Sequence, residues 1–568
     1  MLEFKNEGNI DNEISKLKRI TSFISAGSII LTANLIAWAI CLITLDNPLL
    51  YGIVTAISFI IFLAYLIFTY RFYVALAHKN NVKKVYFNHR LRRNNEYSKF
   101  FDTGSDLIDK EDYKELDLDL FGKNSLFQYL SVCKTKYGRL KLKEALTTPR
   151  DNDTDYTDTI EYLANDEHTV EIEARLLEFK SDAKKLDYDI MYQAFETKIK
   201  FNPLWLIPIL SFLGTIVYLI LIFTLGLNPY FLFIFGFTNF ILAKLCLKNE
   251  VFDIDSTNYY YLMDNYYYLS KELESIDPKA KRLEEIKHEA SKSILDIRKI
   301  KNILNLLSTR RNIIFNIFSN LICIFDLFII LIFNNKAKSI INLKKYFELV
   351  GELECMMSLA NIGMDNEVYT KPNDGEINGV DMYHPLIKNC VPNSLALSGG
   401  IILTGSNMSG KTTFMRTLGI CQTLYNAKGL IPAKSFTSTN LNIYTSLRAN
   451  DMLAEGISTF YAEILRMKKI NEAIKSQHVL VLIDEIFKGT NATDRISASL
   501  KVIDKLNSFN ASFIITTHDF ELCDANNITN YHFNEEYIND KISFDYMIKE
   551  GKCETKNAIY LLKMADII

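Results

Sequence analysis

Residues 405–412 place a glycine-rich turn, a lysine and a threonine at the spacing that holds a triphosphate. The segment Gly405-Ser-Asn-Met-Ser-Gly-Lys411-Thr412 fits the pattern G-x-x-x-x-G-K-[ST] at every fixed position. Its glycines let the backbone wrap closely round an anion, so that N–H groups and the following helix N-terminus point at the phosphates. We expect Lys411 to reach the β- and γ-phosphates of ATP and the Thr412 hydroxyl to ligate Mg²⁺. The predicted nucleotide-binding residues of this loop are Gly405, Ser406, Asn407, Met408, Ser409, Gly410, Lys411, Thr412 and Thr413.

Two carboxylates follow a second apolar run. Residues 478–485 read HVLVLIDE, which is typical of a central parallel strand that is buried on both faces and delivers acids to its C-terminal edge. Asp484 is expected to hold Mg²⁺ through its waters, and Glu485 to orient the attacking water. A third run, residues 512–518, ends at His518, which we interpret as a residue that senses or contacts the γ-phosphate. The alternative for a single histidine is a structural role.

Ser458 lies between the loop and the acid pair, just before a helix expected to extend through Lys469. A serine at a helix N-terminus is most often a cap. In a dimer, one subunit would also present this serine to the γ-phosphate bound by the other subunit. The positive end of the helix dipole would then stabilise the negative charge on the transferred phosphoryl group. The residues alone leave both interpretations open.

The elements around these residues predict the fold class. A strand over 401–404 precedes the loop, and the spacing after it is helical, so residues 384–568 are expected to form an α/β P-loop NTPase domain. The chain has 568 residues and a net charge of −3, and 49% of its residues are hydrophobic. That balance fits neither a disordered chain nor a nucleic-acid-binding tail. The nine cysteines are dispersed without a C-x-x-C pair, which favours free thiols in a reducing compartment.

Two long stretches without charge predict membrane helices. Residues 20–45 and about 48–70 are each long enough to span a bilayer, with a turn at Asp46-Asn47-Pro48 between them. A second charge-free stretch, within residues 201–247, breaks at Gly226-Leu-Asn-Pro229 and reads as a second hairpin, so that four spans are expected. Buried core helices are the alternative for both hairpins.

The distribution of lysine and arginine predicts the orientation of these hairpins. Basic residues flank both hairpins, and neither turn carries one. The positive-inside rule therefore puts the turns outside and the P-loop domain in the cytoplasm, as in a multi-pass protein of the cell membrane. The basic stretch from Arg71 to Lys99 is read as this flank, with anionic lipid or a nucleic-acid backbone as alternative partners. A further apolar run, residues 312–335, contains Asp326 and is read as a buried helix.

The motifs resemble the ATPase domain of the MutS family of DNA mismatch-recognition proteins. Residues 404–416, TGSNMSGKTTFMR, are similar to that family's TGPNMGGKSTYMR loop. Residues 458–463 are similar to its S-T-F-x-x-E segment, residues 482–490 to L-x-D-E-x-G-R-G-T, and residues 517–521 to T-H-x-x-E. Weaker likeness to the family's helical core begins near Phe121.

The resemblance implies further properties. It implies ATP and Mg²⁺ as cofactors, a homodimer in which Ser458 completes the partner's site, DNA as a partner, and Tyr546 as the aromatic residue that stacks on adenine. The chain departs from the family where mismatches are read, because membrane hairpin and basic linker occupy the space before residue 121. Mismatch recognition itself is therefore not expected. The expected segments are 1–95 (first hairpin and basic linker), 96–200 (helical core, first part), 201–247 (second hairpin), 248–383 (helical core, second part) and 384–568 (ATPase domain).

Two other functions share part of this pattern. An ABC-type membrane transporter would use the same loop, acid pair and histidine, but Leu397-Ser-Gly-Gly400, which resembles the transporter signature, precedes the loop instead of following it. A nucleotide-dependent membrane scaffold without DNA binding or catalysis would not need Lys411, Asp484, Glu485 and His518 together. The membrane-anchored ATPase is the main hypothesis.

Overall fold

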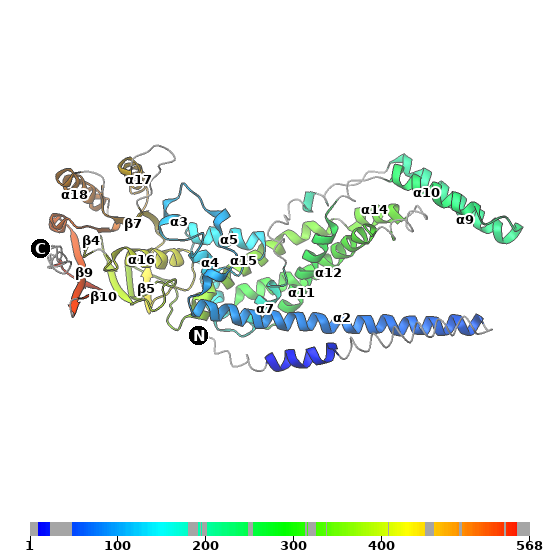
Figure 1. Ribbon diagram of the computed structural model, residues 1–568. Coiled ribbons are helices and arrows are strands. Elements are labelled where there is room, and N and C mark those ends of the chain that lie inside the picture. The colour runs from blue at the N-terminus through cyan, green and yellow to red at the C-terminus, as the bar shows by residue number, and fades with distance from the viewer. Residues whose placement is uncertain are drawn as a thin grey trace.

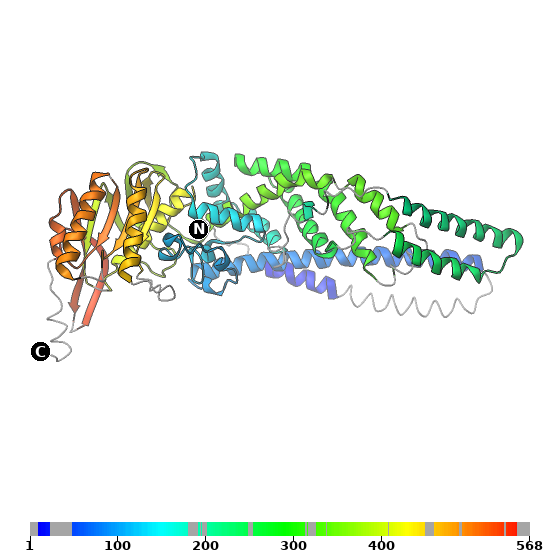
Figure 2. The ribbon, with the colours of Figure 1, turned by 90° about the horizontal axis from the view of Figure 1, so that it is seen from above.

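Parallel strands build the centre of the C-terminal part of the chain. Two of them, Gly400–Thr404 and Ser512–Thr516, are buried at every residue, as expected for strands covered on both faces. The structure is a computed structural model. It describes residues 10–22, 48–179, 191–193, 195, 202–247, 254–312, 315, 325–336, 338–406, 408–448, 459–487, 491–509, 511–538 and 541–553. Figures 1 and 2 show an elongated molecule with these strands at one end and apolar helices at the other.

A six-stranded sheet forms the centre of this part, in the order β10-β9-β4-β8-β7-β6. Five neighbouring strands run parallel and only β10 is antiparallel. The strands are β4 (Gly400–Thr404), β6 (Asn442–Ser446), β7 (Val479–Asp484), β8 (Ser512–Thr516), β9 (Ile528–Ile538) and β10 (Lys541–Glu550). Because β4, β8 and β7 are adjacent and parallel, their carboxyl ends bring the phosphate loop, His518 and the acid pair to one edge.

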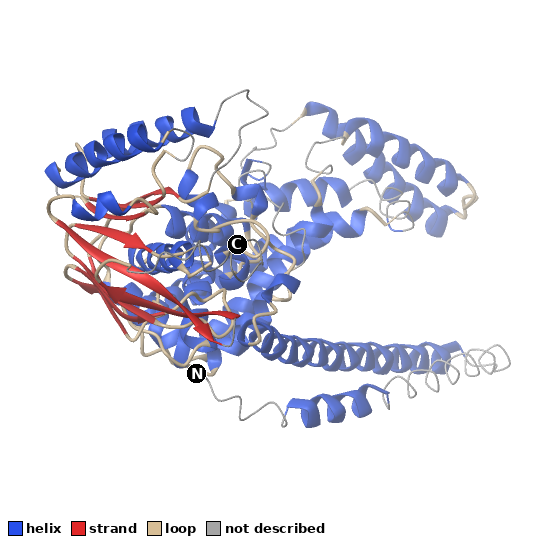
Figure 3. Ribbon diagram, turned by 60° about the vertical axis from the view of Figure 1, so that its left-hand side comes forward, coloured by secondary structure: helices blue, strands red, loops and turns tan. Residues whose placement is uncertain are grey.

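Helices and a second sheet surround this sheet (Figure 3). The helices are α16 (Lys411–Asn426), α17 (Thr459–Ala473) and α18 (Ala492–Ser508). A four-stranded mixed sheet has the order β1-β5-β2-β3, built from β1 (Asn373–Asp374), β2 (Ile377–Met382), β3 (Asn393–Leu397) and β5 (Ser435–Ser438). Residues 373–553 are called the nucleotide domain below. The predicted α/β class of this region is confirmed, while the second sheet was not predicted.

The region before the nucleotide domain contains helices and no strand among the residues that the structure describes, as predicted. Its axis is α15 (Ser339–Asp365), which is buried along its C-terminal half. The helices around it are α3 (Tyr113–Asp117), α4 (Leu126–Leu130), α5 (Lys136–Thr147), α6 (Thr154–Asn165), α7 (His168–Leu176), α11 (Ser256–Ser275) and α12 (Lys281–Arg310). We call this group the helical region. One apolar core runs from it into the nucleotide domain, so the two parts are packed together.

A single helix, α2 (Pro48–Arg93), contains both the predicted second span and the residues expected to form a basic linker. The prediction of a linker is wrong, because residues 71–93 continue the helix and pack on α7 and α15. Lys79 pairs with Glu171, and Lys83 pairs with Asp11 at 2.6 Å. Much of the positive charge in this stretch is therefore neutralised within the chain.

His89 joins the packed half of α2 to the end of α15. Its Nδ1 lies 2.9 Å from Asp365 and its Nε2 lies 3.3 Å from Glu173, and the histidine is completely buried. Burial alone would lower the pKa of His89, but the adjacent carboxylates outweigh it and raise the pKa to about 9. A protonated His89 thus forms an ion pair inside the protein, where removal of either partner would leave a buried charge.

The apolar helices project away from the helical region (Figure 1). They are the first half of α2, α9 (Leu206–Leu225) and α10 (Phe231–Cys246). Their large exposed side chains include Ile60, Ile61, Ile67 and Phe68 on α2 and Leu210, Val217, Phe223, Phe233 and Phe237 on the α9–α10 hairpin.

Two helices of the described chain are long and apolar enough to cross a membrane, Ile60–Arg93 and Pro203–Leu225. The second of these ranges includes the short η4 (Pro203–Trp205) that precedes α9. Four spans were predicted. Helix α10 has only 16 residues and falls short of a full span, and the predicted first span lies mostly outside the described residues.

Helix α14 (Phe325–Lys336) occupies part of the run 312–335. Asp326 is buried and receives two hydrogen bonds from Arg310, at 2.8 and 2.9 Å. Ile330 packs with Trp205, Ala243 and Leu247 at the base of the α9–α10 hairpin. This helix therefore joins the hairpin to the helical region.

Candidate nucleotide site

Two glycines shape the loop between β4 and α16. Gly405 has φ +137°, and a Cβ atom there would lie 2.8 Å from the carbonyl oxygen of Phe533 on β9. Gly410 has φ +109° and is the N-cap of α16. Both conformations favour glycine. The backbone conformation of the loop therefore accounts for the two glycines of the G-x-x-x-x-G-K-[ST] pattern, in addition to any need for close approach to a ligand. Asn407 lies outside the described residues, and Met408 beside it has φ +72° and is largely exposed.

Lys411 is buried at the first position of α16 and folds back over the loop. Its Nζ donates hydrogen bonds to the carbonyl oxygens of Gly405, at 2.8 Å, and Ser406, at 2.7 Å. The hydroxyl Oγ of Ser406 is buried and has no hydrogen-bond partner among the described residues. The ammonium group is thus held inside the curve of the loop, where an anion bound to the loop N–H groups would meet it.

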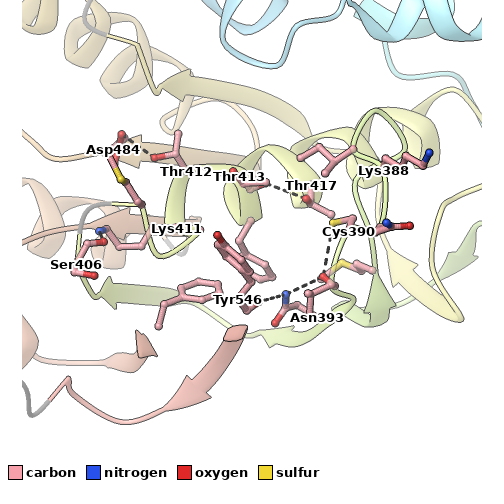
Figure 4. A pocket seen from close by; sticks show the side chains of 18 of the residues that line it. Lys388, Cys390, Asn393, Ser406, Lys411, Thr412, Thr413, Thr417, Asp484 and Tyr546 are labelled. Carbon is pink, nitrogen blue, oxygen red and sulfur yellow. Dashed lines mark hydrogen bonds between the residues drawn. The ribbon is translucent and has the colours of Figure 1, made fainter. Parts of the chain in front are cut away.

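Asp484, the last residue of β7, contacts the start of α16 directly after the loop. The hydroxyl of Thr412 donates to Asp484 Oδ2 at 3.1 Å, as Figure 4 shows, and the Thr516 hydroxyl donates to Oδ1. A threonine hydroxyl beside a carboxylate offers oxygen ligands of the kind that Mg²⁺ prefers. The structure brings together the two residues predicted to hold the metal.

Glu485 and His518 face each other at the same edge. His518 Nε2 lies 3.1 Å from Glu485 Oε1, and both side chains are partly exposed. Glu485 has φ +56°, an uncommon conformation for a residue with a side chain, and its N–H donates to the carbonyl of Thr516 at 3.1 Å. The Glu485 side chain lines the same cavity as the phosphate loop.

One cavity of about 690 Å³ contains these groups. Its volume is in the range of small-molecule sites. Of the predicted residues, its lining includes Ser406, Met408, Gly410, Lys411, Thr412, Thr413, Asp484, Glu485, His518 and Tyr546. Gly405 and Ser409 belong to the same loop but are not in its lining, because Gly405 packs under β9 and Ser409 Oγ donates to the carbonyl of Ser406 at 2.9 Å.

Tyr546 reaches the cavity from an irregular part of β10, where the pairing with β9 shifts register between Phe544 and Ile548. Tyr546 has φ +54°, and its ring lies against Gly410, 3.3 Å from where a Cβ would be. Asn393 fixes this bend. Its Nδ2 donates to the carbonyl of Tyr546 at 2.9 Å (Figure 4). Its Oδ1 accepts from the N–H of Ile548 at 2.7 Å.

A second wall of the cavity was not predicted. It consists of Met382, Ile387, Lys388, Asn389, Cys390, Val391 and Asn393, from the turn between β2 and β3, and of Phe533 on β9. His384 begins this turn, and burial with the nearby Arg416 lowers its pKa to about 4, so it is neutral near pH 7. The sequence does not predict this wall, because the wall forms where the turn between β2 and β3 meets β9 and β10.

The site was expected to be completed by Ser458. That residue lies outside the described residues, and α17 begins immediately after it at Thr459. Its assignment stays a prediction.

The residues present fit a nucleoside triphosphate with Mg²⁺. A cation inside a glycine-rich loop, a helix N-terminus, a Thr–Asp oxygen pair and an aromatic ring occupy one cavity. The fold and this site define a P-loop nucleotide-binding domain.

Comparison with known proteins shows which family the nucleotide domain resembles. The family model described as MutS domain V matches residues 401–567. Most of this match lies in the nucleotide domain, which is therefore similar to domain V of the MutS family.

Relatives named "DNA mismatch repair protein MutS" are similar over the same part. The chain is 30% identical to the protein of Aquifex pyrophilus over 238 residues, which are 39% of this chain and 27% of that protein. It is 32% identical to the protein of Persephonella marina over 240 residues, which are 39% of this chain and 27% of that protein. It is 30% identical to the protein of Bacillus licheniformis over 252 residues, which are 41% of this chain and 29% of that protein. The matches thus cover less than a third of each relative.

Gly405→Ala tests whether the loop geometry is needed for ligand binding. The added Cβ would lie 2.8 Å from the carbonyl oxygen of Phe533, so the loop must shift. We expect the affinity for a fluorescent ATP analogue to fall at least about tenfold, or about 1.4 kcal/mol. Gly399→Ala is the matched control, because Gly399 also has positive φ but has open space where the Cβ would stand. Equal affinity in the two variants would contradict the role of the loop.

Proposed function

We propose that the chain binds and hydrolyses ATP. The observation that supports this best is the convergence of Lys411, Thr412, Asp484, Glu485 and His518 on one cavity, from the ends of three adjacent strands. A P-loop that served binding alone would need the lysine and the threonine but not a Glu–His pair beside them. Bound Mg²⁺ would neutralise charge that develops on the phosphates.

Each residue then has a role set by its place. The loop N–H groups and Lys411 bind the β- and γ-phosphates, and Thr412 and Asp484 hold the metal. Glu485 orients the attacking water, and His518, 3.1 Å away, is held by Glu485 and faces the γ-phosphate. Tyr546 stacks on the adenine ring and Asn393 holds the bend that presents it. The reaction needs charge stabilisation and positioning, with no covalent intermediate.

The active form is proposed to be a homodimer. His518 and Glu485 are partly exposed at the edge of the cavity, so a second subunit has access to the γ-phosphate position. Ser458, directly before α17, is the residue proposed to reach it from the partner subunit. ATP binding would close the dimer and hydrolysis would open it.

The chain is further proposed to be anchored in the cell membrane, with the nucleotide domain in the cytoplasm. Apolar side chains are exposed on α2 and on the α9–α10 hairpin, at the end of the molecule opposite the nucleotide domain (Figure 2). Within the hairpin the polar group of Asn239 is buried and satisfied between helices, by Ser211 at 2.6 Å and Thr215 at 3.1 Å. This arrangement suits lipid, where side-chain amides pair across helices.

DNA is the partner that the relatives' names suggest. Mismatch recognition is not part of the proposal, because the matches cover only the C-terminal part of this chain. A second candidate is a membrane ATPase that does not bind DNA. It is favoured by the internal ion pairs of the basic stretch, since Lys79, Lys83 and Arg93 all have carboxylate partners within the chain.

Glu485→Gln tests the catalytic proposal. The variant keeps the loop and the metal ligands, so we expect ATP affinity to be retained and kcat to fall by about 10²- to 10³-fold. Steady-state phosphate release from the full chain in detergent measures this. Glu376→Gln, an exposed carboxylate of the same domain outside the cavity, is the control, and Lys411→Ala is the binding-deficient reference. Equal turnover in the Glu485 variant and the unmodified chain would remove the catalytic assignment.

Epitope insertion tests the membrane topology. A short tag between Leu227 and Asn228, in the hairpin turn, should be labelled by antibody on intact wall-stripped cells. The same tag between Lys475 and Ser476, on the surface of the nucleotide domain, should be labelled only after permeabilisation. Labelling of the second tag from outside, or recovery of the folded full chain without detergent, would refute the anchoring.

A binding titration separates the two partner hypotheses. Labelled duplex, branched and single-stranded DNA would be titrated with the detergent-purified chain, with and without a non-hydrolysable ATP analogue, at 50 and 200 mM salt. Binding through phosphate contacts should weaken at least about tenfold over this range. Absence of binding, or affinity that ignores salt, would favour the membrane ATPase without DNA.

A further inference from the structure

The last residue of α3, Asp117, and the turn after it, which contains Asp119, carry two acids of the helical region that bind groups of the nucleotide domain. Asp117 is completely buried. Asp119 has φ +52°, which turns the backbone so that both carboxylates face the same domain. Leu118 between them packs on α16, since a Cβ at Gly419 would lie 2.6 Å from its side chain.

Asp117 holds the end of β6 and the body of α17. Its carboxylate accepts hydrogen bonds from the N–H groups of Leu447, at 2.9 Å, and Arg448, at 3.2 Å. Arg466 on α17 lies 3.6 Å from the same carboxylate, donates to the carbonyl of Arg448 at 2.9 Å, and lies 4.4 Å over the ring of Tyr113 on α3.

Asp119 holds Arg448 and the helix that follows the phosphate loop. Both of its oxygens accept from Arg448 Nη2, at 2.5 and 2.6 Å, and Oδ2 lies 3.4 Å from Arg416 Nη1. Arg416 is on α16, five residues after Lys411, so it moves with the start of that helix. Burial lowers the pKa of the Arg416 guanidinium. The nearby carboxylates of Asp119, Asp117 and Asp484 act in the opposite direction and raise this pKa, but their effect is smaller.

We propose that the turn Asp117–Asp119 positions α16 and α17 relative to each other and transmits nucleotide-dependent movement of the phosphate loop into the helical region. A ligand that draws Lys411 and Thr412 toward its phosphates displaces the first turns of α16, and Arg416 then pulls on Asp119. Arg448 and Arg466 link the same acids to β6 and α17. The inference rests on the proposed function, because it requires a bound nucleotide.

Asp119→Asn tests this transmission in the full chain. Asparagine has the same shape and tolerates positive φ, so the turn is retained while the charge is lost. We expect the affinity for ATP to stay within about threefold and kcat to fall about tenfold, the scale of a coupling energy between sites. The ATP-induced change in amide hydrogen exchange over residues 113–147 should be lost. Arg448→Met removes the same pair from the other side and should behave alike.

Asp106→Asn is the matched control. Asp106 also makes a two-bond pair with an arginine, Arg139, at 2.5 and 2.9 Å, but both residues lie in the helical region. This variant should keep kcat and the ATP-induced exchange. If the Asp119 and Arg448 variants retain both, or if the unmodified chain binds ATP without any exchange change over 113–147, the inference is overturned. If the unmodified chain fails to bind ATP, the proposed function fails with it.

Discussion

The structure of the candidate site depends on the carboxylate of Asp484, which accepts from Thr412 on one oxygen and from Thr516 on the other. These two bonds join the end of β7 to the start of α16 and to the end of β8. Because the three elements are held at one point, the phosphate loop and the Glu485–His518 pair have a fixed separation. Thr412 and Asp484 are also the residues that would hold Mg²⁺, so one carboxylate would serve both the metal and the packing of the strand ends.

Beyond this point a long helix connects the packed body of the molecule to its apolar end. Helix α2 alone has 46 residues, which corresponds to about 70 Å of rise. It packs on α7 and α15 through the buried pairs of His89, and α15 continues to the start of the nucleotide domain. The helical region is therefore one packed body between the nucleotide site and the apolar helices. A change in the tilt of this body would move the apolar ends further than the site itself.

Much of the site was predictable because it is local in sequence. The loop at 405–413, the acids at 484 and 485 and His518 each end a strand, and adjacency of parallel strands brought them together as expected. The wall from Met382 to Asn393 was not predictable, since it depends on how β2 and β3 meet the irregular part of β10. The continuation of α2 through residue 93 was missed because the composition changes at Arg71. The absence of glycine and proline from 53 to 103 was the available indication.

The internal pairing of the basic stretch bears on what the chain contacts. A helix that presented the basic residues from Arg71 to Arg93 to a nucleic acid would need those cations at its surface. Instead His89, Arg92 and Arg93 converge on the buried Asp365, and freeing them would leave a carboxylate uncompensated in the core. The cations of this network are therefore held inside the protein and are not presented to a nucleic acid. Because this network fixes one half of α2 to the helical region, the apolar half of the same helix is held in a defined position relative to that region.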